Sequence, residues 1–233
     1  MSALPVSREA NSIAPNTDFF CSWSGGKDAC LALYKMQLLG HQPKGLLTML
    51  DETGQHSLAH HLPKTLIEQQ ANAFGLQSFT QAKHKNDYQG AYLKALTHYQ
   101  KQGLNHLVLG DIDLQAHRDW QETQGQLANI TPLFPLWLQD HKQLVLEFIE
   151  AGFTAVIISV LPNKLSSDFL GRELDLNTIK ELEKLGVDVC AEGGEFHTFV
   201  TNGPIFSKAI ELDVSKAKLR TDGDHGYHYL DFS

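Results

Sequence analysis

Residues 18–33, DFFCSWSGGKDACLAL, contain the transition that decides the fold of the first half of the chain. An apolar run suited to a buried parallel strand ends at Ser24, and helical spacing of apolar residues resumes at Ala29. The sequence between them, SGGKD at 24–28, is a glycine turn. Strand, glycine turn and helix together favour anion binding, because glycine lets the backbone approach a ligand and the helix start presents unpaired N–H groups. Lys27 adds a full positive charge, so the stretch predicts a phosphate or pyrophosphate site.

The loop differs from a Walker A motif. That motif requires a further upstream glycine and a Ser or Thr directly after the Lys, and this chain has Cys21 and Asp28 there. SGGKD instead resembles the start of SGGKDS, the pyrophosphate loop of the N-type ATP pyrophosphatases, which split ATP between the α and β phosphates. Ala29 replaces the final serine, so that hydroxyl is absent. The alternative for so short a match is an ordinary glycine turn with a solvent-exposed lysine.

The composition is that of an ordinary globular protein. The chain has 233 residues, 42% of them hydrophobic, enough for one large domain or one domain with a smaller appendage. Net charge −8 and a pI near 5.8 argue against nucleic acid as a partner and favour a small or proteinaceous substrate. The three cysteines form no CxxC pair, which argues against disulfides and structural zinc and indicates a cytoplasmic protein.

Two further expectations concern targeting. Residues 1–17 contain prolines and asparagines but no continuous apolar core, so we expect a flexible N-terminal tail and not a signal peptide. No run approaches the roughly 18 apolar residues that a membrane span needs, so we expect no membrane partner.

Strands and helices alternate along the first half of the chain. Expected strands lie at 19–23, 45–50, 76–80 and 106–109, and expected helices begin at Ala29 and span 62–74 and 88–99. Such alternation predicts an α/β domain with a doubly wound parallel sheet and helices on both faces.

A domain boundary is expected in residues 130–137, ITPLFPLW, because its two prolines disfavour a long helix or a central strand. The following region has its own elements, a helix at 144–152, a buried strand at 153–161 and a helix at 176–185. We therefore divide the chain into a nucleotide-binding domain at 18–130 and a smaller α+β C-terminal domain at 131–233.

Gly110 and Asp111 directly follow the strand at 106–109, at the carboxyl end where open α/β sheets bind ligands. Asp111 is a candidate Mg²⁺ ligand or hydrogen-bond acceptor, and the alternative is a turn in which it caps the next helix. On that helix Arg118 and Glu122 have the spacing of a surface ion pair, with phosphate binding by Arg118 as the sharper alternative.

A group of histidines, His56, His60 and His61, has a spacing that invites a metal interpretation. Adjacent histidines on a helix point in different directions, and no acidic residue or cysteine completes a tetrahedral set, so a loop or substrate contact is favoured. His225 and His228 near the C-terminus are interpreted in the same way.

The second informative stretch is residues 189–206, VCAEGGEFHTFVTNGPIF. Glu192 and Glu195 flank a flexible Gly-Gly turn, and His197 follows. Such a cluster suits Mg²⁺, an amine or ammonium, or general-base catalysis. The alternative is an acidic loop that caps a hairpin.

Five motifs in order carry a resemblance: SGGKD, GDI, PLW, LGRELD at 170–175, and EGGEFHTFV with GPIF. Together they resemble the ATP-binding family that contains diphthine–ammonia ligase, over nearly all of residues 19–211, and the segment 57–71 is most similar to its bacterial branch. One departure is Ala191, where the family usually has glycine.

The resemblance implies a HUP-like fold, ATP and Mg²⁺ as cofactors, and a role for each matched position. Ser24, Gly25, Gly26, Lys27 and Asp28 would bind the phosphates; Gly110 and Asp111 would line the nucleotide site; Glu192, Gly193, Gly194, Glu195 and His197 would form the substrate side. From its position on the helix after Asp111, Arg118 is a further candidate for nucleotide binding. The implied catalytic residues are Lys27, Asp28, Glu192, Glu195 and His197, the implied metal ligands are Asp28 and Asp111, and the implied assembly is a homodimer.

The implied reaction is an ATP-dependent amidation. A carboxylate would attack the α-phosphorus to give an acyl adenylate and pyrophosphate, and ammonia would then displace AMP. The acceptor is left open between a diphthine-like protein residue and a small molecule. The alternatives are a related enzyme that acts on another acceptor, including RNA thiolation, and a non-catalytic nucleotide sensor.

Overall fold

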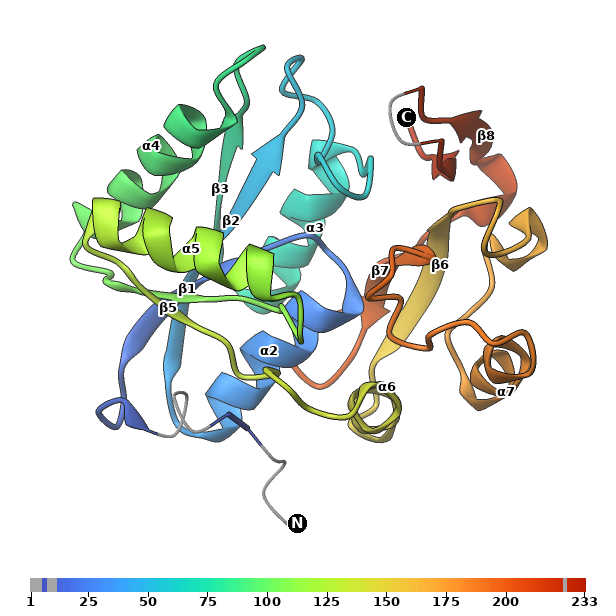
Figure 1. Ribbon diagram of the computed structural model, residues 1–233, viewed down its shortest axis with the longest axis horizontal. Helices are drawn as coiled ribbons and strands as arrows, with labels where there is room; N and C mark the ends of the chain where they lie inside the picture. Colours follow the sequence, from blue (N-terminus) through green and yellow to red (C-terminus); the bar gives the residue numbers. More distant parts are fainter. Residues whose placement is uncertain (1–5, 8–11, 224–225) are drawn as a thin grey trace.

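The computed structural model describes residues 6–7, 12–223 and 226–233. Most of the tail expected at 1–17 lies outside the described residues, as does His225. Figure 1 shows a larger α/β part with a smaller sheet beside it. In the part of the chain that is described, no helix is long and apolar enough to cross a membrane.

The first sheet is parallel, with the strand order β3-β2-β1-β4-β5. Its strands are β1 (Asp18–Ser22), β2 (Gln42–Leu50), β3 (Gln77–Ala82), β4 (His106–Val108) and β5 (Thr131–Leu133), and its helices are α2 (Lys27–Leu38), α3 (Lys64–Phe74), α4 (Tyr88–Gln100) and α5 (Gln115–Ala128). This order confirms the predicted doubly wound, HUP-like α/β fold.

Both faces of the sheet are covered because successive side chains of β1 point to opposite sides. Phe19 and Phe20 are fully buried. Phe19 packs in the core formed with α2 and α3, and Phe20 packs in the core formed with α4 and α5. The uninterrupted apolar run of β1 is therefore the signature of a strand buried on both faces.

The predicted boundary region contains a strand of the first sheet. β5 includes Pro132 and pairs only with β4, so it is an edge strand, where proline is tolerated. The division of the chain at residue 130 stays a prediction, and the structure adds that Thr131–Leu133 belongs to the larger sheet.

The second sheet is antiparallel, with the order β7-β6-β9-β8. It comprises β6 (Thr154–Val160), β7 (Phe196–Asn202), β8 (Lys218–Thr221) and β9 (His228–Asp231), accompanied by α6 (His141–Glu150) and α7 (Leu176–Lys184) and by two short 3₁₀ turns, Ser167–Phe169 and Val214–Lys216. This is the smaller α+β part that the sequence predicts. The strands β8 and β9 carry polar, partly exposed residues and had no apolar pattern to reveal them.

The two parts share one hydrophobic core, which fixes the position of the second sheet against α2. Tyr34 of α2 meets Phe153 edge-on, with ring centroids 5.3 Å apart. Beside them, Lys35 of α2 and Glu147 of α6 form a buried ion pair at 2.6 Å, with side chains 0% and 2% exposed. Removing either partner would leave a buried charge, so this pair ties the two helices together.

Candidate active site

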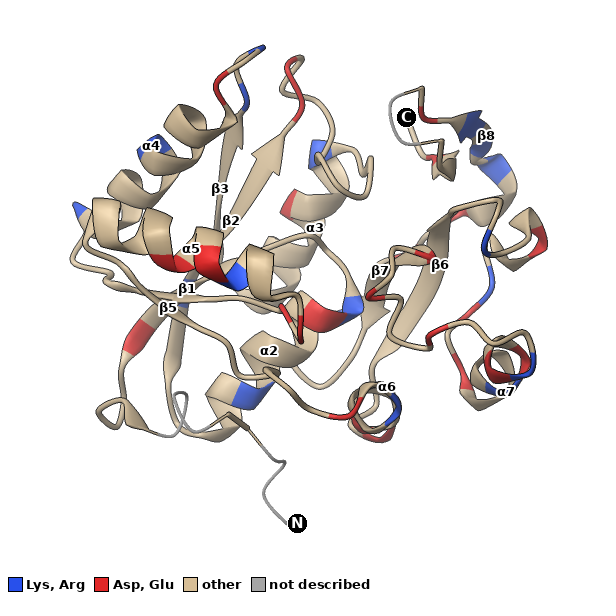
Figure 2. Cartoon of the chain, in the orientation of Figure 1, with Lys and Arg blue, Asp and Glu red and all other residues tan. Residues whose placement is uncertain are grey.

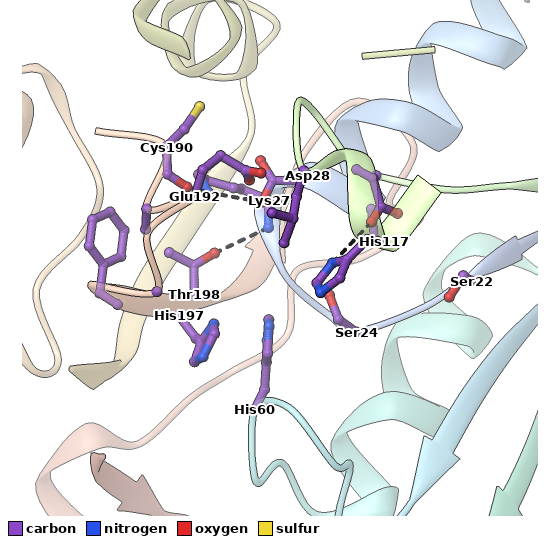
Figure 3. A pocket seen from close by; sticks show the side chains of 17 residues that line it. Ser22, Ser24, Lys27, Asp28, His60, His117, Cys190, Glu192, His197 and Thr198 are labelled. Atoms are coloured by element: carbon purple, nitrogen blue, oxygen red, sulfur yellow. Dashed lines mark hydrogen bonds and ion pairs between the residues drawn. The ribbon is translucent and has the colours of Figure 1, made fainter. Parts of the chain in front are cut away.

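A cavity of about 380 Å³ lies beyond the carboxyl ends of β1 and β4 and is lined from both parts of the chain (Figure 3). β1 and β4 are neighbours at the point where the strand order reverses, which is where doubly wound sheets bind ligands. Of the predicted site residues, Ser24, Lys27, Asp28, Gly110, Asp111, Glu192, Gly194 and His197 line this cavity, and Gly25, Gly26, Arg118, Gly193 and Glu195 do not.

The two glycines of the SGGKD loop are required by close packing. Gly25 has a φ of +84°, which disfavours any side chain, and a Cβ there would lie 3.0 Å from the Gln70 side chain. A Cβ at Gly26 would lie 2.6 Å from the ring of His60. The loop is therefore closely packed against α3 and against the segment that follows β2.

Gln70 of α3 fixes the loop in place through hydrogen bonds. Its buried amide accepts a hydrogen bond from Trp23 Nε1 (2.8 Å) and donates to the carbonyl groups of Gly25 (3.0 Å) and Val200 (2.7 Å). The backbone N–H of Val200 also donates to the Gly25 carbonyl (2.9 Å). The phosphate loop is thus joined to β7, the strand that carries the second motif. No sequence motif pointed to Gln70.

Lys27 starts α2 and is only 5% exposed. Its ammonium group donates to the Cys190 carbonyl and pairs with Asp28 at 2.9 Å. Burial lowers the pKa of Lys27, but the nearby acidic groups, Asp28 foremost, raise it by more, so the ammonium stays charged. The burial excludes the alternative of a solvent-exposed lysine in an ordinary glycine turn.

Two N–H groups of the loop have hydroxyl acceptors. Gly26 donates to Ser24 Oγ (3.2 Å), and Lys27 donates to Thr198 Oγ1 (3.1 Å). The sequence predicts unpaired N–H groups at this helix start, and the structure shows that these two are already used. Figure 3 shows Thr198 reaching the loop from β7.

Gly110 lets the chain after β4 approach the start of α2. A Cβ at this position would lie 2.7 Å from the backbone nitrogen of Ala29, so only glycine fits. Asp111 lines the cavity and lies 3.5 Å from His117, whose pKa it raises. The N-cap position of α5 is occupied by Leu114, which makes no side-chain cap hydrogen bond, and this excludes the alternative that Asp111 is the N-cap residue.

The acidic loop at 188–195 is organised by Asp188. Its carboxylate accepts the N–H groups of Cys190 (3.1 Å) and Glu192 (3.0 Å). His141, the first residue of α6, bridges this loop to the loop after β4, because Nδ1 lies 2.9 Å from Asp188 and Nε2 lies 3.1 Å from Asp113. Burial lowers the pKa of His141, but the two carboxylates raise it by more. His141 therefore connects two walls of the site.

The two glutamates of the acidic loop have different surroundings. Glu192 lines the cavity, and burial, with a smaller contribution from the Asp28 carboxylate, raises its pKa to about 7. Glu195 instead accepts from Lys164 Nζ at 3.3 Å, and Lys164 also donates to the Gly193 carbonyl (2.5 Å). Glu192 is therefore the glutamate that lies at the cavity, and the catalytic roles of Glu192 and Glu195 stay predictions.

His197 stacks on His60 with ring centroids 4.6 Å apart. Burial, with a contribution from the charge of Lys27, lowers the pKa of His197 to about 4, and burial lowers that of His60 as well, so both rings are neutral at pH 7. The adjacent His61 stacks on Tyr229 (4.5 Å), and His56 lies 3.1 Å from the Ser233 hydroxyl. The histidine-rich segment thus contacts β7 and the C-terminal hairpin.

Arg118 occupies a separate environment. Its guanidinium lies 4.8 Å from the rings of both Phe134 and Trp137, and it pairs with Glu122 at 2.8 Å. The predicted ion pair is confirmed. Phosphate binding by Arg118 stays a prediction, and its place outside the cavity lining gives that prediction no support.

Asp28 and Asp111 suit Mg²⁺ chemically. Both line the cavity, and the charge of Asp111 contributes to the raised pKa of Asp28, whose main cause is burial. Mg²⁺ in nucleotide sites commonly takes one or two carboxylates together with phosphate oxygens, so this donor set fits. Within the described ranges, no three His, Cys, Asp or Glu side chains are grouped to hold a metal.

A second cavity of about 140 Å³ adjoins the first and shares Ser22, Ser24 and His60 with it. Its other walls are largely apolar and aromatic, with Leu47, Met49, Tyr88 and Tyr92 among them. An apolar and aromatic cavity next to an anion loop suits a heterocyclic base.

This fold and this site together define an α/β protein of the HUP-like class with a pyrophosphate-type loop at its switch point. Comparison with known families refines the assignment: residues 19–126 match the diphthamide synthase N-terminal domain and residues 140–231 match the diphthamide synthase C-terminal domain. The chain belongs to the diphthamide synthase family.

Relatives named diphthine–ammonia ligase occur in several eukaryotes. The proteins from Mus musculus and Homo sapiens are each 27% identical to this chain over 223 and 224 residues, which cover 85% of this chain and 84% of the relatives. The protein from Schizosaccharomyces pombe is 25% identical over 228 residues, 88% of this chain but 37% of that longer protein. Family membership supports ATP-dependent ligase activity, and a bacterial type stays a prediction.

Proposed function

We propose that this chain is an acid–ammonia ligase that uses ATP to adenylylate a carboxylate and then amidates it, with AMP and pyrophosphate as products. The observation that carries the proposal is the meeting of the two motifs in one cavity. Lys27 of the first motif donates to the backbone of Cys190, beside the second, and is buried under it. An anion loop and an ionisable carboxylate with a raised pKa therefore face the same volume.

The triphosphate would lie along residues 24–28, with the adenosine in the adjoining aromatic cavity. Lys27 is a charged donor held in a buried position, where it would stabilise the charge that develops on the departing pyrophosphate. Asp28 and Asp111 would hold Mg²⁺, which, when bound, neutralises phosphate charge.

The nucleophile of the second step must be uncharged ammonia, because ammonium has no lone pair. The carboxylates of Asp28 and Glu192 would attract ammonium into the cavity. Glu192, whose pKa is near 7, is in part ionised at neutral pH and would accept the proton. The ammonia nitrogen then bonds to the acyl carbon while the bond from that carbon to the AMP oxygen breaks, and the nitrogen gives up one proton to the departing phosphate or to solvent.

The acceptor is proposed as a carboxylate of the diphthine type, on a protein or in a small molecule that presents the same group beside a cationic centre. The partners are thus ATP, ammonia and this carboxylate. A cytoplasmic location and a homodimer remain predictions.

The test is the product pattern of the wild-type protein. It should release AMP and pyrophosphate when ATP, ammonium and a diphthine-bearing protein or small-molecule carboxylate are present together, and Lys27→Ala should abolish both products. Production of ADP and orthophosphate would refute the proposal. Tight ATP binding without product for any acceptor would favour a nucleotide sensor.

A further inference from the structure

Thr198 lies at the junction of the two motifs. It belongs to β7, its side chain is buried (3% exposed), and it lines the cavity together with Lys27 and Ala29. Its Oγ1 accepts a hydrogen bond from the backbone N–H of Lys27, 171 residues earlier in the chain, at 3.1 Å (Figure 3). The second part of the chain thus contributes a hydroxyl group to the phosphate loop.

The hydrogen of this hydroxyl has no acceptor among the side chains and backbone groups of the described residues. A threonine hydroxyl is one donor as well as an acceptor, and Thr198 uses its oxygen for the Lys27 N–H. A buried donor without a partner is destabilising, so the hydrogen should point to the one polar space it can reach, the cavity. A ligand oxygen there would complete the group.

The loop itself lacks such a hydroxyl. Ala29 stands where the pyrophosphate loop SGGKDS ends in serine, and Ala29 lines the same cavity. Ser24 also accepts a loop N–H, from Gly26, and its hydroxyl likewise lines the cavity. Ser24 therefore fixes the loop backbone and also lies at the cavity.

We propose that Thr198 is a phosphate-binding residue, and that its hydroxyl replaces, from the second part of the chain, the hydroxyl missing at position 29. The inference rests on the proposed use of ATP and adds that the pyrophosphate end of the nucleotide is bound by both motifs. A hydroxyl that accepts from a backbone N–H becomes a better donor, since hydrogen bonds in a chain polarise one another. The occupant is a phosphate or pyrophosphate oxygen, which can only accept.

Equilibrium binding of ATP, inorganic pyrophosphate and AMP, measured by calorimetry, tests this role. Thr198→Val keeps the shape of the side chain and removes the hydroxyl. The affinities for ATP and pyrophosphate should fall by about 10- to 100-fold, because one hydrogen bond to a charged group is lost. The affinity for AMP should change by less than about twofold. Thr198→Ser should restore both affinities. The matched control is Thr201→Val, on the same strand, whose hydroxyl donates to the Thr154 carbonyl away from the cavity.

A merely structural role would give a different pattern. If Thr198 only held the loop, the affinities for ATP and pyrophosphate would also fall in Thr198→Val, but Ala29→Ser could not recover them, and that result would overturn the proposal. The proposal expects Ala29→Ser to recover part of the pyrophosphate affinity of Thr198→Val, because it returns a hydroxyl to the loop itself. The proposal would be overturned if folded Thr198→Val lost affinity for ATP, pyrophosphate and AMP to the same extent. It would also be overturned if its affinity for pyrophosphate equalled that of the wild type.

A second variant covers the case in which Thr198→Val does not fold. Thr198→Cys retains the size and supplies only a weak donor, so it should show the same order of affinities with a smaller loss. Unchanged pyrophosphate affinity in folded Thr198→Cys would also count against the role. Wild-type protein that binds neither ATP nor pyrophosphate would refute the proposed function itself, which is a distinct result.

Discussion

The phosphate loop at 24–28 and the acidic loop at 188–195 face each other across one cavity but are built differently. In the first, the carbonyl of Gly25 and the N–H groups of Gly26 and Lys27 all have partners, and two of these come from β7. In the second, Gly193 is exposed and Ala191 has a φ of +60°. One wall is fixed by buried uncharged hydrogen bonds and the other by partly exposed charges.

This difference indicates that the two loops have different roles in the proposed reaction. A transition state that develops charge on pyrophosphate is stabilised by donors already in place, and the phosphate loop provides them. A step that moves a proton needs a group that titrates near neutral pH, and Glu192 provides it. Figure 2 shows a basic and an acidic segment side by side at the start of α2, at the end that lies next to the smaller sheet. The following changes test how firmly each wall is fixed.

The largest effect is expected from Gln70→Leu. The change leaves the buried Trp23 N–H and the Val200 carbonyl without the partners they now have, so the free energy of unfolding should fall by about 3 kcal/mol. Affinity for ATP should fall too, because the Gly25 carbonyl of the loop loses one of its two hydrogen-bond partners. Urea unfolding and ATP titration measure both effects. Gln69→Leu, at the exposed neighbouring position of α3, is the control, and equal stability of the two variants would contradict the role.

The next effect is expected from Glu192→Gln in metal-free buffer. The pKa of Glu192 is raised from 4.5 to about 7 in the folded state, so the native state loses stability as the pH rises from about 4.5 to about 7, and the full cost is present above that range. The glutamine variant should therefore unfold with a free energy about 1–2 kcal/mol above that of the wild type at about pH 8, because solvent screens part of the cost, and should match it near pH 4.5. In a separate assay with Mg²⁺ present, amide formation should fall sharply while ATP binding is kept. A variant less stable at the higher pH would contradict the assignment.

A smaller effect is expected from His141→Gln. The pKa of His141 is raised in the folded state by Asp188 and Asp113, so its stabilising effect is complete below the unfolded pKa of about 6.5 and is lost as the pH rises through the folded value. The variant should lose about 1 kcal/mol at low pH, since the pair is partly exposed, and less at high pH. Stability curves in acid and alkaline buffer test this, with Lys142→Gln as the exposed neighbour. A loss that grows with pH would show that His141 acts as a neutral group.

The sequence predicted those elements that depend on residues adjacent in the chain. The run Phe19–Cys21 and the turn at Gly25 and Gly26 are adjacent in the chain, so strand, loop and helix could be inferred together. The meeting of Glu192 with Lys27 came only from the resemblance, and the roles of Gln70, Thr198 and His141 came from neither. These three side chains act on groups 28 to 171 residues away, and contacts of that separation leave no periodic or spacing signal in one sequence.

The smallest effect is expected from Ala191→Gly, which tests whether the acidic loop is strained. Ala191 has a φ of +60°, where an alanine side chain is unfavourable and glycine is not. Glycine also increases the entropy of the unfolded chain, which offsets part of the gain, so the net increase in stability should be about 0.5 kcal/mol, or 1–2 °C in Tm. The opposite change, Gly194→Ala, should lower Tm, since φ there is +74° and a Cβ would lie 2.7 Å from the Tyr227 hydroxyl. Calorimetric melting compares the two variants, and a lower Tm for Ala191→Gly would mean that the acidic loop is as well fitted to its sequence as the phosphate loop.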